Sequence, residues 1–384
     1  MSSIETVKPV VTTKPSTRQA CISKQMIIPA KYAQMTADEI SRQIQDKKQQ
    51  FGDELVILAH HYQKSEIIPF ADYVGDSLQL AKSAAANRAA KHIIFCGVHF
   101  MAETADMLTT ADQKVYLPDA MAGCSMADMA NLAQLERAWQ LLEATYVEPV
   151  IPVTYINSTA EVKAFVGDHN GVIVTSSNAE MILKRVFAQH QRVLFLPDQH
   201  LGRNTAFQLG IPLAEMAIWN PKKDQLLPHD SNQDPQNLKV ILWKGRCCVH
   251  QQYTVDQIAQ LRQQIPDLKV IVHPECPIEV VQASDFYGST KKIIDVVAAS
   301  PAHTKWAIGT DNNLVNRMIR DLPDHDIVSI DPTAFSCITM NRIRLAHLLW
   351  TLEEIENGST LQQITVDKAT QISSLKALDR MLEM

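Results

Sequence analysis

The chain has 384 residues, of which 46% are hydrophobic and 20% charged, as in a soluble globular protein with two or three domains. Its formal net charge of -6 argues against general nucleic-acid binding, which needs a basic face. No apolar stretch reaches the roughly 18 residues of a membrane span, and no secretory signal opens the chain, so we expect a cytoplasmic protein.

Short apolar runs rich in Val and Ile recur along the chain. They are typical of strands that are buried on both faces of a parallel sheet. Segments with apolar residues at helical spacing lie between these runs, for example at 76–92, 177–190 and 289–303. Strands that alternate with helices predict an α/β fold.

The apolar runs group into three similar units, and each unit ends in a cysteine: Cys124, Cys247 or Cys337. Within a unit, three runs follow one another and each ends in polar residues. The runs are 56–62, 93–100 and 115–119 in the first unit, 152–158, 171–178 and 193–200 in the second, and 270–276, 286–290 and 306–311 in the third. If the units pack around a common axis, the three thiolates converge on one point, and this suggests a metal ion or a cluster.

These units suggest the organisation of the whole chain. A stretch at 204–237 separates two runs of the second unit, and we interpret it as an insertion that is largely surface loop. The predicted parts are a flexible extension at 1–36, domains at 37–125, 126–246 and 247–340, and C-terminal helices at 341–384 that pack on the first domain.

Polar residues cluster directly after the predicted strands in all three units. In open parallel sheets, ligands bind beyond the carboxyl ends of the strands. We therefore predict one site that is lined from three sides. The clusters with the clearest patterns are AHHYQ (59–63), GDSLQLA (75–81), GVHFMAETA (97–105), YINSTAEVKA (155–164), VTSSNAE (174–180), PDQHLGRN (197–204), GRCCVH (245–250), HPEC (273–276), GST (288–290), IGTDNN (308–313) and CITM (337–340).

Taken together and in this order, the motifs resemble the quinolinate synthase (NadA) family over about residues 37 to 380. The resemblance implies three Rossmann-like, three-layer αβα domains related by pseudo-three-fold symmetry, with the site at the central axis. It also implies a [4Fe–4S] cluster that is held by one cysteine from each domain.

By this resemblance the cluster ligands are Cys124, Cys247 and Cys337. The family pattern Gly-x-Cys-x-Val-His fits residues 245–250 with Cys247 as the ligand, which leaves Cys248 as a neighbour. A cubane cluster normally takes four thiolates, so three leave one iron open to act as a Lewis acid. An open iron favours dehydration or condensation over electron transfer.

The implied activity is the condensation of iminoaspartate with dihydroxyacetone phosphate to quinolinate in NAD biosynthesis, with functional coupling to L-aspartate oxidase. The resemblance nominates Glu275, His60, Tyr62 and Tyr155 as catalytic residues. It nominates as substrate-binding residues His60, Ser77, Tyr155, Asn157, Ser176, His250, His273, Glu275, Ser289 and Thr290. We expect a raised pKa for Glu275, because a carboxylate near a cluster and anionic substrates is hard to ionise.

Two other classes of protein stay open as alternatives. An electron-transfer or iron-sensing protein would need a fourth ligand, but the sequence has no Cys-x-x-Cys run. A structural zinc site usually takes its ligands from such close pairs, whereas Cys124, Cys247 and Cys337 are far apart along the chain. Both observations favour the enzyme.

Overall fold

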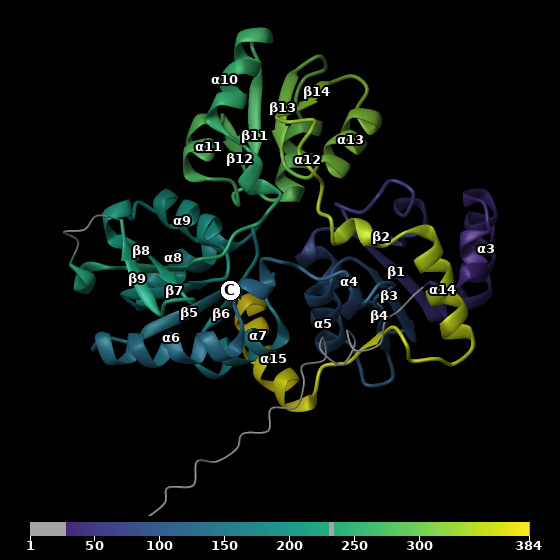
Figure 1. Cartoon of the computed structure of the whole chain (residues 1–384), viewed down its shortest axis with the longest axis horizontal. Helices are drawn as coiled ribbons and strands as arrows, with labels where there is room; N and C mark the ends of the chain where they lie inside the picture. The colour runs from purple at the N-terminus through teal and green to yellow at the C-terminus, as the bar shows by residue number, and fades with distance from the viewer. Residues whose placement is uncertain (1–27, 230–233, 384) are drawn as a thin grey trace, which may run out of the picture.

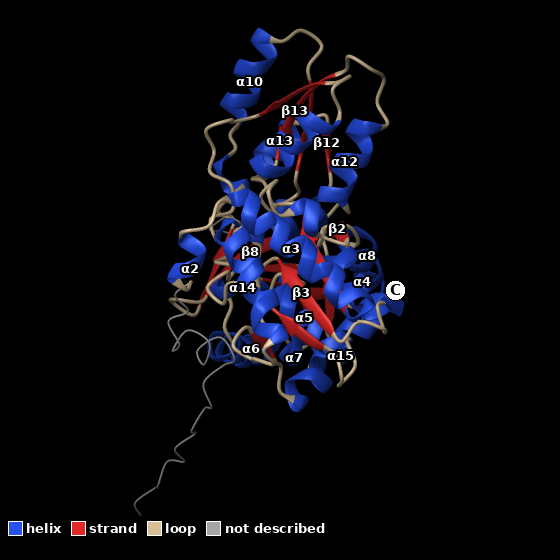
Figure 2. Cartoon of the chain, turned by 90° about the vertical axis from the view of Figure 1, so that its right-hand side faces the viewer, coloured by secondary structure: helices blue, strands red, loops and turns tan. Residues whose placement is uncertain are grey.

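The computed structural model describes residues 28–229 and 234–383, and it confirms the expected α/β fold (Figure 1). Three sheets are each flanked by helices, as the red strands between blue helices show in Figure 2. Most of the predicted extension, residues 1–27, lies outside the described residues. The described part of this extension, residues 28–36, is packed against the rest of the chain. Tyr32 in α2 (Ala30–Ala33) is 3% exposed, and its hydroxyl donates a hydrogen bond to Glu353.

The first sheet carries five strands in the order β15-β4-β3-β1-β2. All six residues of β1 are buried, as expected for a strand covered on both faces. The strands are β1 (Leu55–His60), β2 (Tyr73–Gly75), β3 (His92–Cys96), β4 (Lys114–Tyr116) and β15 (Gln363–Ile364); the main helices are α3 (Ala37–Phe51), α4 (Ser77–Ala86), α5 (His99–Leu108) and α14 (Leu345–Glu356).

The second sheet carries six strands in the order β6-β5-β7-β10-β8-β9. Its strands are β5 (Val150–Tyr155), β6 (Val172–Val174), β7 (Arg192–Leu196), β8 (Met216–Asn220), β9 (Gln225–Pro228) and β10 (Val240–Trp243). Its helices are α6 (Leu132–Thr145), α7 (Ala160–Asp168), α8 (Ala179–Gln189) and α9 (Gln199–Gln208). The last helix of the chain, α15 (Lys368–Glu383), also packs here, on α7 and β6.

The third sheet carries four strands in the order β12-β11-β13-β14, all of them parallel. Its strands are β11 (Lys269–Val272), β12 (Phe286–Tyr287), β13 (Lys305–Gly309) and β14 (Asp326–Ser329); its helices are α10 (Val255–Gln264), α11 (Ile278–Ala283), α12 (Thr290–Ala298) and α13 (Asn312–Asp321).

The three sheets share one core order of strands. In each of them the first strand of the unit lies between the second and the third, and a further strand follows the third: β2-β1-β3-β4, β6-β5-β7-β10 and β12-β11-β13-β14. The pairs within these four-strand cores are parallel, so the carboxyl ends of the strands in each core lie at one edge. This repeated topology agrees with three similar units, but the strands predicted for the first unit are partly wrong: the runs 93–100 and 115–119 correspond to its third and fourth strands, β3 and β4, and the short β2 was not among the predicted runs.

Two expectations about the organisation are wrong. The stretch 204–237 is not mainly loop, because it contains the end of α9 and both β8 and β9, which extend the second sheet beyond β10. Trp219 in β8 is 4% exposed, so this extension is part of the core. Of the C-terminal helices, α14 packs on α3 of the first unit as expected, but α15 packs mainly on α7 and β6 of the second and touches the first unit at α5.

The first two units share one hydrophobic core, whereas the third unit has two smaller cores of its own. Tyr62 is packed against both the shared core and one core of the third unit. The third unit therefore meets the other two largely through polar groups, and these groups include the candidate site. Among the described helices, none combines the length and the apolar character that crossing a bilayer requires.

Candidate active site

One cavity lies where the three units meet, beyond the carboxyl ends of β1, β5 and β11. Polar residues and cysteines from all three units line it. The residues nominated from the sequence that line this cavity are His60, Tyr62, Ser77, Cys124, Tyr155, Asn157, Ser176, Cys247, His250, His273, Glu275, Thr290 and Cys337. The three cysteines in this list come from segments far apart along the chain, as the sequence pattern predicts.

The three cysteines sit in loops of the same local structure. In each loop a short 3-10 helix begins three residues after the cysteine: Ala127–Met129, His250–Gln252 and Met340–Arg342. In each, the cysteine carbonyl accepts the N–H of the residue four positions later, at 3.1 Å for Cys124, 3.1 Å for Cys247 and 3.0 Å for Cys337. Each sulfur also accepts the N–H of the first residue of the 3-10 helix.

This environment suits thiolate ligands of a metal centre. Burial raises the pKa of Cys124, Cys247 and Cys337, so without a cation the thiols keep their protons. A bound metal deprotonates a coordinating thiol, and N–H groups that point at the sulfur then stabilise its charge. The donor set therefore fits a three-thiolate cluster. Cys248 is exposed, and its sulfur accepts a hydrogen bond from Ser125.

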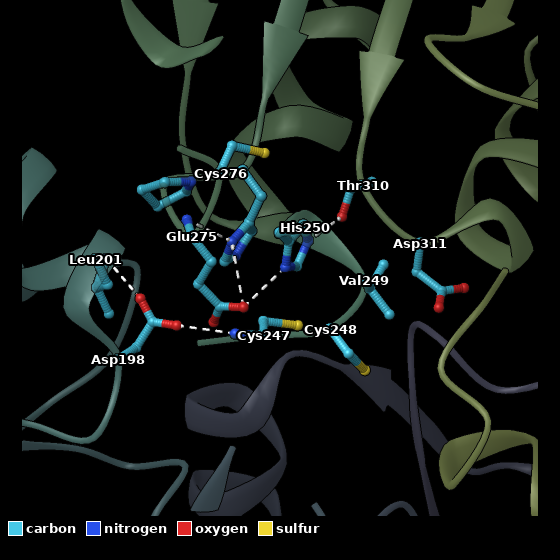
Figure 3. Close-up of polar contacts among 12 residues, drawn as sticks. Asp198, Leu201, Cys247, Cys248, Val249, His250, Glu275, Cys276, Thr310 and Asp311 are labelled. Atoms are coloured by element: carbon cyan, nitrogen blue, oxygen red, sulfur yellow. Dashed lines mark hydrogen bonds and ion pairs between the residues drawn. The ribbon is translucent and has the colours of Figure 1, made fainter. Parts of the chain in front are cut away.

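Glu275 is the centre of a buried polar group in this cavity (Figure 3). Its Oε2 lies 2.8 Å from Nδ1 of His250, and the carboxylate also accepts a hydrogen bond from the Tyr155 hydroxyl. Burial alone would raise the pKa of Glu275, but the neighbouring His273 and His250 and the hydrogen bonds from His250 and Tyr155 lower it. Without a bound cluster or substrate the pKa of Glu275 is therefore lowered and not raised, because these neighbours outweigh the cost of burial.

His60 and His273 have the same local geometry in two different units. Nδ1 of His60 accepts the N–H of Tyr62 at 3.1 Å, and Nδ1 of His273 accepts the N–H of Glu275 at 3.3 Å. Burial lowers the pKa of His60, and burial together with His250 lowers that of His273 to about 3. Both rings are therefore neutral near pH 7, and we assign the ring proton to Nε2.

The structure adds Thr310 to this polar group. Its fully buried hydroxyl lies 2.7 Å from the Tyr62 hydroxyl and 3.1 Å from Nε2 of His250. Because an ionised Glu275 can only accept, the proton of His250 is assigned to Nδ1, and Nε2 then accepts from Thr310. A continuous chain of hydrogen bonds thus joins Tyr62 of the first unit to Glu275 of the third. In the sequence, Thr310 follows a predicted strand and lies in the motif IGTDNN (308–313), but neither observation nominated it as a site residue.

Three hydroxyl groups in the cavity stand at the beginning of helices. Ser77 and Thr290 are the first residues of α4 and α12, and Ser176 lies just before α8. Helix N-termini favour anionic groups, because their backbone N–H groups are unpaired. Asn157 adds a buried side-chain oxygen without a hydrogen-bond partner. Ser289 is not among the lining residues, since its hydroxyl caps α12 by accepting the N–H of Lys292.

One further group of potential ligands lies in the same place. Side-chain atoms of Cys247, His250 and Glu275 lie within 4.8 Å of one another, which is close enough to hold a metal ion. Only Cys247 of this set is among the three predicted cluster ligands. His250 and Glu275 already pair with each other, so we interpret them as groups beside the metal centre rather than as its ligands.

Comparison with known proteins gives consistent matches over nearly the whole chain. The family model described as Quinolinate synthetase A protein matches residues 42–383. The chain is 56% identical over 361 residues to a quinolinate synthase of Listeria innocua, which covers 94% of this chain and 98% of that protein. It is 51% identical over 383 residues to a quinolinate synthase of Bacillus cereus, with 100% of both chains covered.

Proposed function

Because this chain belongs to the quinolinate synthase family, we propose that it condenses iminoaspartate with dihydroxyacetone phosphate to quinolinate in NAD biosynthesis. Phosphate and water are the other products. The observation that carries this proposal is the repeated loop that brings Cys124, Cys247 and Cys337 to one cavity. We further propose a cytoplasmic setting, in which L-aspartate oxidase supplies the unstable imine.

The three cysteines are the proposed ligands of a [4Fe–4S] cluster. Their sulfur atoms line one cavity, and each accepts a backbone N–H from its own loop. When bound, such a cluster has one iron without a protein ligand, and this iron supplies Lewis-acid chemistry for the loss of water. Pseudo-three-fold symmetry of the units is part of the same proposal, and the common strand order supports it.

Both substrates are anionic, and the cavity offers donors that suit carboxylate and phosphate groups. We propose that Ser77, Ser176 and Thr290, at the beginnings of three helices, bind these groups. His60 and His273 each have an Nε2–H that can donate to a carboxylate without a change of protonation. His250 and Asn157 complete the proposed set, and Ser289 contributes indirectly by capping α12.

Acid–base chemistry is assigned to Glu275 and two tyrosines. Its low pKa keeps Glu275 ionised near neutral pH, so we propose that it accepts a proton from the bound substrate. Burial raises the pKa of both Tyr62 and Tyr155, so their hydroxyls stay protonated, and we propose that they turn from Thr310 and Glu275 to donate to a developing oxyanion. The bond between Tyr155 and Glu275 brings the proton acceptor and one donor together.

The neighbouring pair Cys247 and Cys248 offers a matched test. The two variants Cys247→Ser and Cys248→Ser are reconstituted anaerobically, and iron, sulfide and quinolinate formation are measured for each. We expect Cys247→Ser to lose at least about 100-fold in rate, because a ligand should matter more than an outer-shell group. Cys248→Ser should retain the iron and the rate of the wild type. Wild-type iron content and rate in Cys247→Ser would contradict the proposal.

A further inference from the structure

Two buried aspartates follow the third strand of their units at equivalent positions. Asp198 follows β7, Asp311 follows β13, and each is 0% exposed. Each is the N-cap of the next helix, because one carboxylate oxygen accepts a helix N–H: that of Leu201 at 2.7 Å for Asp198, and that of Asn313 at 2.9 Å for Asp311. These bonds explain one oxygen of each carboxylate.

The second oxygen of each aspartate binds the backbone of a proposed cluster ligand. Oδ2 of Asp198 accepts the N–H of Cys247 at 3.1 Å, and Figure 3 shows Asp198 between Leu201 and Cys247. Oδ2 of Asp311 accepts the N–H of Cys337 at 2.7 Å. Each carboxylate therefore ties the start of a rigid helix to one cysteine loop.

The first unit has no aspartate at the equivalent position: Val98, which follows its third strand β3, is the N-cap of α5 and makes no side-chain cap hydrogen bond. Asp119 follows β4 and is 4% exposed, but its Oδ1 accepts the N–H of Met121 at 2.8 Å rather than that of Cys124. Its Oδ2 accepts from Nε of Arg342 at 2.9 Å, and Arg342 is the last residue of the 3-10 helix in the loop of Cys337. A direct bond from a buried carboxylate to a proposed ligand cysteine is thus found at Asp198 and Asp311, whereas the equivalent helix of the first unit, α5, begins without one.

We propose that Asp198 and Asp311 are positioning residues for the cluster: their second carboxylate oxygens hold Cys247 and Cys337 in place and so govern how long the cluster is retained. The inference rests on the proposed function. An N-cap needs only one acceptor, and serine provides it as well as aspartate does. The cap itself does not need the second acceptor, whereas the cysteine N–H does, because a buried N–H without a partner is costly.

Serine variants separate the two roles of each carboxylate. In Asp198→Ser and Asp311→Ser the hydroxyl still caps the helix, but it is too short to bind the cysteine N–H as well. In the asparagine variants the shape is kept, but the amide has one acceptor for two N–H donors. Asp367→Ser is the matched control, since Asp367 caps α15 through the N–H groups of Ala369 and Thr370 and bonds to no cysteine.

The experiment measures iron release from the anaerobically reconstituted holoenzyme after addition of a ferrous chelator. We expect release to be about tenfold faster in the variants of Asp198 and Asp311, the factor that one buried hydrogen bond represents. Asp367→Ser should release iron at the wild-type rate. Amide hydrogen exchange of the apoproteins gives a second readout, in which peptides with Cys247 or Cys337 lose protection only in the matching variant.

The outcomes distinguish the two proposals. Serine variants that release iron at the wild-type rate, with unchanged exchange in the cysteine loops, would overturn this inference and leave the proposed function intact. A wild-type protein that takes up no iron and sulfide would overturn both. Faster release in Asp367→Ser as well would also overturn it, because the effect would then follow from any weakened helix cap.

Discussion

Removal of the Thr310 hydroxyl is the sharpest test of the polar chain in the cavity. Valine has nearly the same shape as threonine, so Thr310→Val deletes the bonds to Tyr62 and His250 and little else. The His250 nitrogen is then buried without a partner, which costs about 1–3 kcal/mol, and the lost bond to Tyr62 adds about 1 kcal/mol. If the chain acts in the transition state, a total of about 2–4 kcal/mol lowers kcat/KM about 30- to 900-fold.

The assay is steady-state quinolinate formation by variants with matched iron content. Thr310→Ser keeps the hydroxyl, so it should recover a rate within a few-fold of the wild type even though its buried methyl group is lost. Iron content is the essential control, because Thr310 is adjacent to Asp311, which bonds to Cys337. A Thr310→Val variant with wild-type iron content and kcat/KM would refute the role assigned to this chain.

Two further predictions concern the buried carboxylate of Glu275 and the partly buried carboxylate of Asp106. Glu275→Gln should lower kcat/KM by about 10²–10⁴-fold at unchanged iron content, since the amide keeps an acceptor for His250 but cannot take up a proton; a rate near that of the wild type would exclude Glu275 as the base. Burial raises the pKa of Asp106 from 3.8 to about 6, so its stabilising contribution is complete below pH 3.8 and is lost as the pH rises through about 6. Asp106→Asn, which still accepts the N–H of Val366, should raise the free energy of unfolding by up to about 3 kcal/mol at about pH 7.5 and by little at about pH 4. Urea unfolding at both pH values checks this, and equal shifts would contradict it.

The α/β fold could be predicted from the sequence because its strands are short, buried and rich in Val and Ile. The same pattern failed at 204–237, where Pro212, Pro221 and Pro228 and several amide and acidic residues are typical of loops. The buried strand β8 lies between two of these prolines. Apolar runs report burial well, but a strand bounded by turn-forming residues gives a weak signal.

The position of α15 depends on a contact that a sequence pattern does not show. Its amphipathic face predicts packing but not the partner. In the structure, Ser374 donates a hydrogen bond to the carbonyl of Ala160 in α7, and a methyl group at Gly167 would lie 1.9 Å from the carbonyl oxygen of Ser373. The missing side chain of Gly167 is thus what allows the two helices to approach so closely.

In the candidate site, the identity of the lining residues was easier to predict than their electrostatics. The polar ends of the strands brought nearly all of the nominated residues to one cavity. The low pKa of Glu275 and the place of Thr310 depend on individual atoms, namely Nδ1 and Nε2 of His250. Such contacts join segments far apart along the chain, so no local pattern contains them.

The central claim is that Cys124, Cys247 and Cys337 together hold one cluster with an iron that has no protein ligand. Iron and sulfide analysis of the anaerobically reconstituted protein, with spectra recorded before and after addition of quinolinate, tests it most directly. We expect about four irons and four sulfides per chain and a change in the cluster spectrum on addition of quinolinate. Bound zinc without sulfide, or a cluster whose spectrum does not change when quinolinate is added, would contradict the account.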